Sequence, residues 1–401
     1  MRSSKSMEAS APDSGADAPR QPQAHPRGAE TAPRRPGQDR PGQDRPGQRR
    51  PLQPLKLEQF RGCRHAECEE SRSCTRSARR GHFLRAMGIM AGAVLVLGVV
   101  STLIGGADMS IGAILTGEAS ASDLQILFVS RLPRTLAVIL SGAAMAVAGL
   151  VMQLLVRNRF VEPSTTGVTE SAGLGILVAT VFLPTLSLPG KMLIAVAFAL
   201  AGTALLTLIL RSLDHRDIIV VPLVGLILSG IIGSAATFLA WEFQLQGTLN
   251  AWMTGDFSGI IRGRYELLWI VAVVAALAYL FADRFTIAGL GEDLARNLGL
   301  NYGAVQSVGL TIVAVVTGIT TVVAGPLPFL GLVVPNLVSI FHGDDIRRSL
   351  PLVALMGATF VLVADIIGRV LIAPAEVPVG VVMGILGAGI FLAILMKRVK
   401  K

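Results

Sequence analysis

Ten apolar runs follow one another from residue 86 to the C-terminal region, and they constrain the fold more than any other feature of this sequence. A helix rises about 1.5 Å per residue, so about 20 apolar residues cross a hydrocarbon layer about 30 Å thick. The sequence therefore predicts an all-α integral membrane protein with about ten transmembrane helices in one domain, residues 83–401. The runs lie near residues 86–105, 132–156, 163–184, 191–210, 218–240, 267–283, 304–324, 327–341, 350–372 and 377–396.

Basic residues near the ends of these runs predict the orientation of the helices. Ten crossings place both termini on one side of the membrane. With a cytoplasmic N-terminus, the inner connections carry 12 Lys/Arg and the outer ones carry 5, in agreement with the positive-inside rule. We therefore expect a multi-pass protein of the cytoplasmic (inner) membrane with both termini in the cytoplasm. The eighth run is punctuated by Pro326, Pro328 and Pro335, so it is either a broken helix inside the bundle or a re-entrant segment.

Residues 1–82 differ in composition from the rest of the chain. They hold 17 Lys/Arg and 10 Asp/Glu, a net charge of +7, which leaves 19 and 17, a net charge of +2, for residues 83–401. Because the segment is rich in Pro, Gly and Arg, it is predicted to be a disordered basic tail. The near-neutral apolar body indicates a lipid bilayer as partner and argues against nucleic acid. All three cysteines precede residue 75 with a spacing that fits no usual zinc pattern, and no metal site is expected.

Small residues recur along one face of two of the runs. In lipid, small side chains let helix backbones approach closely, so this pattern predicts a compact bundle. The residues are Gly142, Ala146 and Gly149 in the second run, and Gly380, Gly384 and Gly387 in the tenth.

Several functional classes lack their motifs in this chain. No G-x-x-x-x-G-K-[ST] occurs, so P-loop binding of ATP is not expected. An ion-coupled secondary transporter needs ionisable groups deep in the bilayer, but the acids there are few: Glu162, Glu170 and Asp365. Asp365 precedes Arg369 by one helical turn, and a structural ion pair is the better interpretation. An intramembrane enzyme is disfavoured because the two histidines after residue 82 fall in predicted cytosolic loops.

Three parts of the chain resemble one family of membrane proteins, in order and at the spacing of that family. The family comprises the permease subunits of binding-protein-dependent ABC importers for iron–siderophore complexes, haem and cobalamin, the FecCD/cobalamin type. The resemblance runs from about residue 86 to 398 and excludes the tail. The stretches are RLPRTLAVILSGAAMAVAGLVMQLLVRN at 131–158, AGPLPFLGLVVPNL at 324–337 with GDDIRRSLP at 343–351, and ADIIGRVLIAPAEVPVGVVMGILGAGIFLAIL at 364–395.

The resemblance implies a type II ABC importer permease fold with ten helices. Such a chain translocates its cargo without covalent chemistry, so no catalytic residue and no cofactor are expected. Two ATP-binding subunits would use the ATP, and a soluble or lipid-anchored siderophore-binding protein would deliver the cargo. A second permease subunit would complete the translocation path, and a heterodimer is favoured over a homodimer. An ion-coupled secondary transporter stays the less favoured alternative.

The polar segment 286–303, TIAGLGEDLARNLGLNYG, connects the sixth and seventh runs on the predicted cytoplasmic side. Its pattern predicts two short helices broken at Gly291 and Gly299, because glycine permits sharp turns. An ordinary solvated connector is the alternative. In the family this loop seats in a groove of the ATPase, which implies a coupling loop. The docked surface would consist of Glu292, Asp293, Ala295, Arg296, Leu298 and Gly299.

Arg131 and Arg134 lie three residues apart, on one helical face, at the predicted outer end of the second run. Family members use equivalent arginines, with a third that matches Arg369, to dock acidic side chains of the binding protein. Guanidinium groups suit this role because paired donors match both carboxylate oxygens. Snorkelling of these side chains toward lipid headgroups is the alternative.

Three further stretches resemble the subgroup that serves catecholate siderophores of the enterobactin, vibriobactin or petrobactin type. They imply a ferric siderophore as cargo, with haem or cobalamin as alternatives. Ferric catecholates are anionic, so an outer vestibule with Arg262 and Arg264 would attract them, although these cations could also serve docking alone. Asn336 and Ser339 depart from the His and Arg of many relatives, and no role is assigned to them. The stretches are RNRFVEPSTTG at 157–167, ESAGLGIL at 170–177 and WMTGDFSGIIRGRYELLW at 252–269.

Overall fold

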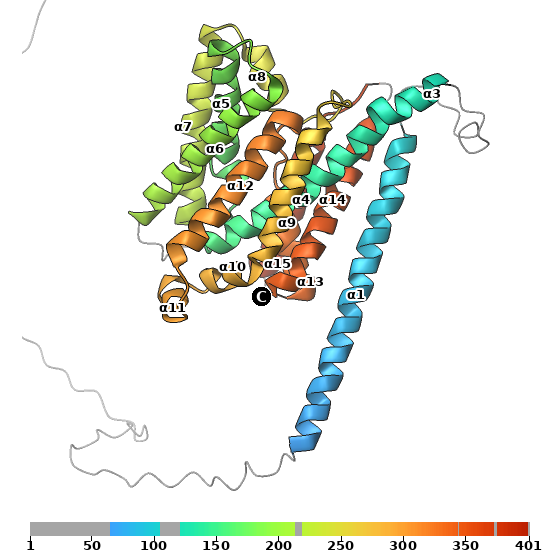
Figure 1. The fold of residues 1–401 in the computed structure, drawn as a ribbon, viewed down its shortest axis with the longest axis vertical. Helices are drawn as coiled ribbons and strands as arrows, with labels where there is room; N and C mark the ends of the chain where they lie inside the picture. Colours follow the sequence, from blue (N-terminus) through green and yellow to red (C-terminus); the bar gives the residue numbers. More distant parts are fainter. Residues whose placement is uncertain (1–64, 105–120, 213–218, 344, 373–374, 400–401) are drawn as a thin grey trace, which may run out of the picture. The chain divides into compact units, whose positions relative to one another are not determined.

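The regular structure of the chain is helical wherever the computed structural model describes it, apart from one isolated bridge between Ile372 and Ala375. The described residues are 65–104, 121–212, 219–343, 345–372 and 375–399. The helices (Figure 1) are α1 His65–Leu103, α3 Ala121–Ile126, η2 Leu127–Arg131, α4 Leu132–Leu155, η3 Pro163–Thr165, α5 Val168–Phe182, α6 Leu188–Arg211, α7 Val220–Glu242, α8 Gln246–Trp252, η4 Tyr265–Leu267, α9 Leu268–Leu280, α10 Ala282–Gly289, α11 Glu292–Asn297, α12 Tyr302–Ala324, α13 Leu330–His342, α14 Ile346–Leu371 and α15 Val379–Val399.

Every predicted apolar run corresponds to helical structure. Among the described residues, seven helical stretches are long and apolar enough to cross a membrane: α1 from Phe83, the stretch from Leu124 through α4, α6, α7, α12, α14 and α15. The pair α9 and α10 forms an eighth candidate that bends by 63°. The remaining two, α5 and α13, have 15 and 13 residues and therefore rise only about 22 and 20 Å. The all-α membrane fold is confirmed, and ten as the number of crossings stays a prediction.

α4 lies at the centre of the bundle, where it packs against α14, α12, α13 and α9. A Cβ atom added at Gly142 would lie 2.8 Å from the carbonyl oxygen of Gly357 on α14. One added at Gly149 would lie 2.2 Å from the Cα of Gly331 on α13. The small-residue face predicted for the second run is thus a contact face. In the tenth run Gly380 and Gly387 make similar close contacts, whereas Gly384 has no neighbour within 4 Å of its Cβ position.

The eighth apolar run contains the short helix α13. It continues through Pro335, and seven consecutive residues from Leu330 to Asn336 are buried. The run therefore contains a short buried helix, and both alternatives, a broken helix inside the bundle and a re-entrant segment, stay predictions.

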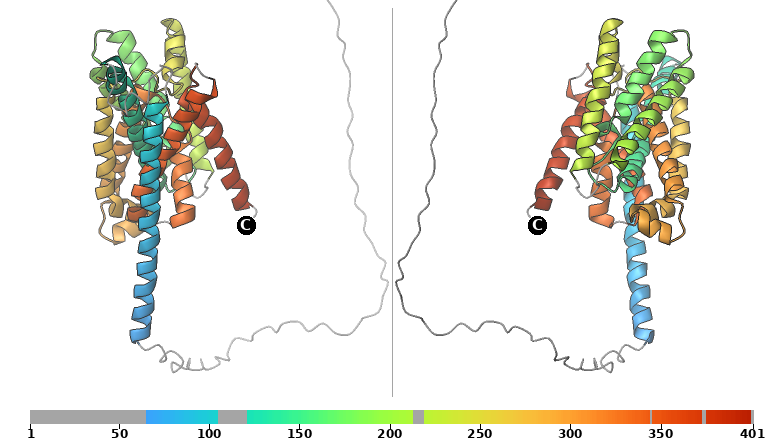
Figure 2. Two further views of the ribbon diagram at one scale, coloured as in Figure 1. Left: turned by 90° about the vertical axis from the view of Figure 1, so that its right-hand side faces the viewer. Right: turned by 90° about the vertical axis from the view of Figure 1, so that its left-hand side faces the viewer.

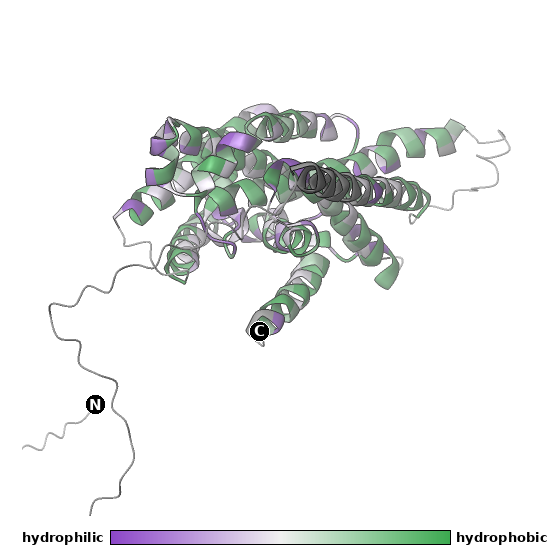
Figure 3. Ribbon diagram, turned by 90° about the horizontal axis from the view of Figure 1, so that it is seen from below, coloured by the Kyte–Doolittle hydropathy of each residue, from purple (hydrophilic) through white to green (hydrophobic). Residues whose placement is uncertain are grey.

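The outward faces of several helices are apolar. Leu193 on α6, Phe238 on α7 and Ile385 on α15 are 71 %, 67 % and 71 % exposed. Figure 3 shows hydrophobic residues along most helices when the molecule is seen from one end. A chain that exposes this many large apolar side chains suits hydrocarbon rather than water as its surroundings.

α1 begins earlier than the first apolar run, at His65, so residues 65–82 are helical where a disordered tail was expected. The reason is composition: the last proline of the tail is Pro54, and residues 65–82 contain Glu, Arg and Ala, which favour helix. The predicted boundary at residue 82 thus lies inside this helix. The disorder predicted for residues 1–64 lies outside the described residues and stays a prediction. α1 packs against α14 and α4 along one side of the bundle (Figure 2).

Candidate functional site

The connection between α9 and α12, residues 286–303, forms a bend that we call the elbow. It contains the end of α10 and the whole of α11. Gly291, with φ of +123°, separates the two helices. Gly299, with φ of +78°, follows α11. Only glycine adopts such backbone angles at little cost. The two short helices and both breaks predicted from the sequence are confirmed.

Five of the six residues predicted at the docked surface are exposed on the elbow. The sixth, Ala295, is fully buried, so it supports the surface from beneath and does not belong to it. The five exposed residues are Glu292, Asp293, Arg296, Leu298 and Gly299.

The elbow exposes three leucines and one ion pair. Leu290, Leu294 and Leu298, spaced four residues apart, are 57 %, 47 % and 62 % exposed. Glu292 and Arg296 form an ion pair of 2.6 Å across one turn of α11. Exposed large apolar side chains near charged ones are typical of a surface that docks a protein partner.

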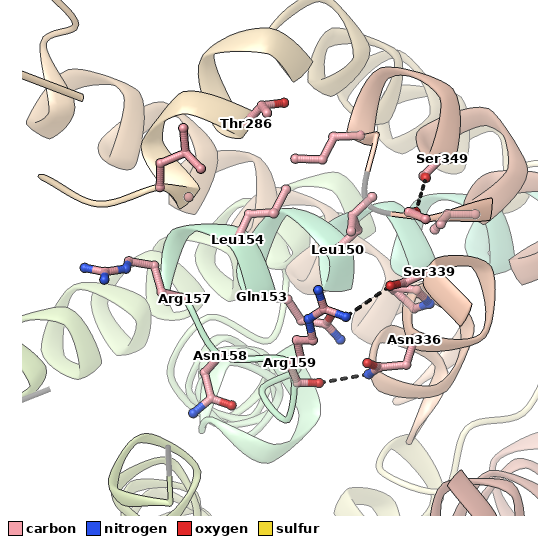
Figure 4. Close-up of a pocket in the computed structure, with 16 residues that line it drawn as sticks. Leu150, Gln153, Leu154, Arg157, Asn158, Arg159, Thr286, Asn336, Ser339 and Ser349 are labelled. Carbon is pink, nitrogen blue, oxygen red and sulfur yellow. Dashed lines mark hydrogen bonds between the residues drawn. The ribbon is translucent and has the colours of Figure 1, made fainter. Parts of the chain in front are cut away.

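A cavity of about 390 Å³ lies between the elbow, the end of α4 and the connection from α13 to α14. Figure 4 shows Leu150 and Leu154 on one wall and a polar group around Arg159 on another. The guanidinium of Arg159 donates to Ser339 Oγ at 3.1 Å. The backbone carbonyl oxygen of Arg159 accepts from Asn336 Nδ2 at 2.9 Å. Asn336 and Ser339, which had no assigned role, therefore hold the α4–α5 connection against α13.

The elbow is joined to the bundle around this cavity. A Cβ at Gly289 would lie 3.7 Å from the carbonyl oxygen of Leu154 on α4. Asp283 of α10 forms an ion pair of 3.0 Å with Arg347 of α14. α10, whose end belongs to the elbow, thus packs against both α4 and α14.

Two of the predicted docking arginines share one buried carboxylate near the other end of α4. Arg134 donates to Asp365 Oδ1 from Nη2 at 2.9 Å, and Arg369 donates to Asp365 Oδ2. Arg134 also pairs with Glu376 at 2.7 Å. Arg134 and Arg369 are 8 % and 6 % exposed, and Asp365 is fully buried. The structural ion pair predicted between Asp365 and Arg369 is confirmed.

Arginines also fasten the end of α1. Arg369 Nη1 donates to the carbonyl oxygens of Ser101 and Ile104 at 2.8 and 2.9 Å. Arg131, 6 % exposed, donates to those of Thr102 and Leu103 at 3.2 and 3.1 Å. Carbonyls at a helix C-terminus have no intrahelical donor, so these bonds satisfy them. The three arginines thus come together and have partners within the chain, and their docking of a binding protein stays a prediction.

Arg262 and Arg264, predicted for an outer vestibule, are both exposed. The backbone N–H of Arg262 donates to the carbonyl oxygen of Val129 at 2.9 Å. This bond places the 252–269 loop beside η2, directly before Arg131. The predicted cations therefore gather at one end of α4, with this pair on the surface, and their attraction of cargo stays a prediction.

Glu162 is a positioning residue whose role the sequence did not reveal. It is 1 % exposed, and it accepts from the backbone N–H groups of Phe329 at 2.8 Å and Leu332 at 3.1 Å. It thereby caps α13 from the connection between α4 and α5. The one local signal was a glutamate beside Pro163 within an apolar region, and that signal does not identify a partner 167 residues away.

No metal centre is visible in the part of the chain that the structure describes, where no three His, Cys, Asp or Glu side chains are grouped to hold an ion.

Comparisons with known proteins cover most of the helical body. The model of the FecCD transport family matches residues 93–397. The petrobactin import system permease protein YclN of Bacillus subtilis (strain 168) is 44 % identical over 305 residues, 76 % of this chain and 96 % of that protein. The petrobactin import system permease protein FatD of Bacillus anthracis is 41 % identical over 307 residues, 77 % of this chain and 90 % of that protein.

A further relative and a solved structure extend the comparison. The vitamin B12 import system permease protein BtuC of Citrobacter koseri is 38 % identical over 274 residues, 67 % of this chain and 82 % of that protein. A structure reported as an inward-facing conformation of a metal-chelate type ABC transporter has a TM-score of 0.68, covering 78 % of this chain and 99 % of that one. At 24 % identity this likeness shows the shared fold alone.

Proposed function

Because this chain belongs to the FecCD transport family, we propose that it is the permease subunit of an ABC importer that carries a ferric siderophore across the cytoplasmic membrane. The observation that carries this proposal is the 44 % and 41 % identity to two petrobactin import permeases over almost the whole helical body. The relative named for vitamin B12 is less similar and matches a shorter stretch. The proposed cargo is a catecholate-type siderophore, with haem and cobalamin as the alternatives.

The permease itself performs no covalent chemistry. ATP is hydrolysed by a separate subunit that binds the elbow, and the exposed leucines and charges of the elbow support this role. The elbow contacts α4 and α14, so closure of the ATPase dimer would move the helical body as a rigid unit. Alternating access then follows from movement of two permease subunits against each other. The second permease is expected to be a different chain.

The two ends of α4 carry the two proposed docking sites. With 24 residues this helix is about 36 Å long, and the elbow and the arginines lie at opposite ends of it. We place the elbow in the cytoplasm together with both termini. The siderophore-binding protein then docks at the end that exposes Arg262 and Arg264, with the buried arginines behind them. Carboxylates on that partner would suit these guanidinium groups.

Iron uptake in a strain without the gene tests this function. Such a strain should lose uptake of radioactive iron supplied as a ferric catecholate, and the wild-type chain should restore it, while cobalamin uptake stays unchanged. Uptake should persist when the membrane potential is collapsed and stop when ATP is depleted. Uptake that follows the membrane potential instead would support an ion-coupled secondary transporter. A loss of cobalamin uptake in this strain would indicate cobalamin as the cargo.

A further inference from the structure

Another cavity, of about 540 Å³, lies between the ends of α4, α6 and α12, beside the elbow. We call it the basic pocket. Three different elements each contribute an arginine to its wall: Arg157 follows α4, Arg211 ends α6 and Arg296 belongs to α11. Glu292 is the single acid among the described residues that line it, and it is paired with Arg296 at 2.6 Å. Within the described residues, Arg157 and Arg211 therefore have no acidic partner.

The charge of the basic pocket favours an anion. Its three arginines and one glutamate leave a net charge of +2. Arginine stays charged at every physiological pH, so the pocket is positive whether Glu292 is ionised or protonated. Paired guanidinium donors match the oxygens of a phosphate group. The Tyr302 hydroxyl lines the same wall, where the charges of Arg157 and Arg211 act on it, and it can donate a further hydrogen bond.

The backbone at Arg157 gives a second, independent indication of a site. Arg157 has φ of +55°, in the left-handed region. Its N–H donates to the carbonyl oxygen of Leu154 at 3.2 Å, and the N–H of Asn158 donates to that of Gln153 at 3.0 Å. These two bonds form the Schellman motif that ends a helix, and glycine is usual at the position of Arg157. A residue with a side chain is strained there, and strain of this kind is concentrated at ligand sites.

The level of the basic pocket in the membrane selects the kind of anion. Arg211 is the last residue and Tyr302 the first residue of two helices that can cross a membrane, α6 and α12. Both therefore lie where a span meets the membrane surface, at the level of the phospholipid headgroups. Farther along the pocket the wall includes Leu206, Leu210 and Leu310. Leu310 follows Tyr302 by eight residues, about 12 Å along α12. A phosphate at the arginines could thus continue into an acyl chain along the leucines, whereas a carboxylate of a protein partner would leave the leucines uncovered.

We propose that the basic pocket binds an anionic phospholipid, with the lipid phosphate between Arg157 and Arg211. Basic pockets between membrane helices on the cytoplasmic side suit such headgroups, and the elbow beside this pocket is placed on that side. This lipid site does not depend on the cargo and so goes beyond the proposed function. A bound lipid would also lie close to the elbow, because Arg157 Nη1 is 3.5 Å from the Cβ position of Gly291.

Native mass spectrometry of the complete transporter, titrated with phosphatidylglycerol in detergent, tests the lipid site. The wild type should bind its first phosphatidylglycerol more tightly than zwitterionic phosphatidylcholine. Arg157→Gly and Arg211→Gln should each weaken the binding of phosphatidylglycerol by about tenfold, because each removes a charge-assisted hydrogen bond to the phosphate. Glycine relieves the backbone strain at position 157, so Arg157→Gly should unfold at the wild-type temperature or above it. Loss of lipid without loss of stability distinguishes binding from a structural role.

A matched control removes the same charge outside the basic pocket. Arg284 is exposed on α10 and does not line the pocket, so Arg284→Gln should bind phosphatidylglycerol as the wild type does. Equal binding of the two lipids by the wild type would overturn the proposal. Displacement of the lipid by inorganic phosphate would do so as well, and would identify a site for free phosphate.

The alternative occupant is a carboxylate of the ATPase. If Arg157→Gly and Arg211→Gln bind phosphatidylglycerol normally but no longer retain the ATPase, the basic pocket docks that subunit and the lipid site is wrong. If Arg157→Gly does not assemble, the comparison of Arg211→Gln with Arg284→Gln decides.

Discussion

Asp365 is the residue on which the arginine cluster depends. It is fully buried and is the shared partner of Arg134 and Arg369. Asp365→Asn keeps the shape of the side chain and removes its charge, which leaves two buried guanidinium groups with one counter-charge fewer. Loss of one partner of a buried ion pair costs about 3–5 kcal/mol. We expect a clear fall in the thermal unfolding temperature of the purified protein in detergent.

Glu376 provides the control for this experiment. It pairs with the same Arg134, but its side chain is 32 % exposed, so Glu376→Gln should cost no more than about 1 kcal/mol. If Asp365→Asn instead unfolds at the wild-type temperature, the cluster does not stabilise the fold. That result would support a role of Arg134 and Arg369 in docking a partner protein. Arg134→Glu alone does not test docking, because it also breaks the buried pair.

Local spacing predicts some of these contacts and not others. The pair Asp365–Arg369 follows from a separation of one helical turn. Arg134 and Asp365 are 231 positions apart, so only the packing of α4 on α14 brings them together. For the same reason the sequence could place the three arginines at one end of the bundle but could not show that they are buried.

At the scale of elements, the contact between α4 and α13 predicts a steep response to one methyl group. A Cβ at Gly149 would lie 2.2 Å from the backbone of Gly331, and neither helix backbone can yield without moving away. Overpacking of this kind costs about 1–3 kcal/mol. Gly149→Ala should therefore lower the unfolding temperature and the amount of protein in the membrane, measured by fluorescence of a fused reporter.

Gly384→Ala serves as the matched change in α15, since nothing lies within 4 Å of its Cβ position. Alanine favours helix over glycine by about 1 kcal/mol, so this variant should be as stable as the wild type or slightly more stable. Equal behaviour of the two variants would contradict the close approach of α4 and α13.

The elbow predicts a loss of function without a loss of stability. Leu298 is 62 % exposed, so Leu298→Glu leaves the fold intact and places a charge on the surface proposed to dock the ATPase. Burying an unpaired carboxylate at an interface core costs several kcal/mol. We expect co-purification of the ATPase and siderophore uptake to fall at least about tenfold, with an unchanged unfolding temperature. Leu298→Met keeps an apolar side chain there and should behave as the wild type. Normal uptake by the glutamate variant would mean that the elbow is a solvated connector.

Most helices could be predicted because a membrane demands long apolar runs, and these are visible in the sequence. Two features of the helices could not be predicted in this way. Residues 65–82 carry no apolar run, so hydropathy does not reveal the helix that they form within α1. The 63° bend between α9 and α10 depends on how α10 packs against α4, α12 and α14, and no proline or glycine marks it in the sequence.

At the scale of the whole molecule, the packing of α4 links the elbow to the arginine cluster. Its two ends contact the elbow and the arginines, and its middle carries the close contacts to α13 and α14. A cavity of about 450 Å³ belongs to the part that the sequence could not predict, because its lining comes from four stretches distant in the chain, around Glu162–Glu170, Met253, Phe329 and Gly380. Its acids were visible as exceptions within apolar runs, and their partners were not.

The number of crossings can be tested with the cysteines of the chain itself. All three, Cys63, Cys68 and Cys74, precede the first apolar run, and residues 83–401 contain none. An even number of crossings places them on the same side as the C-terminal end. A membrane-impermeant maleimide should therefore label the native cysteines in inside-out vesicles and not in right-side-out vesicles.

After replacement of the native cysteines by serine, Lys397→Cys, at an exposed position of α15, should show the same pattern. Arg264→Cys, exposed at the opposite end of the bundle, should show the reverse. Labelling of the native cysteines and of Lys397→Cys on opposite sides would require an odd number of crossings, and one of the two short helices, α5 or α13, would then not count as part of a crossing.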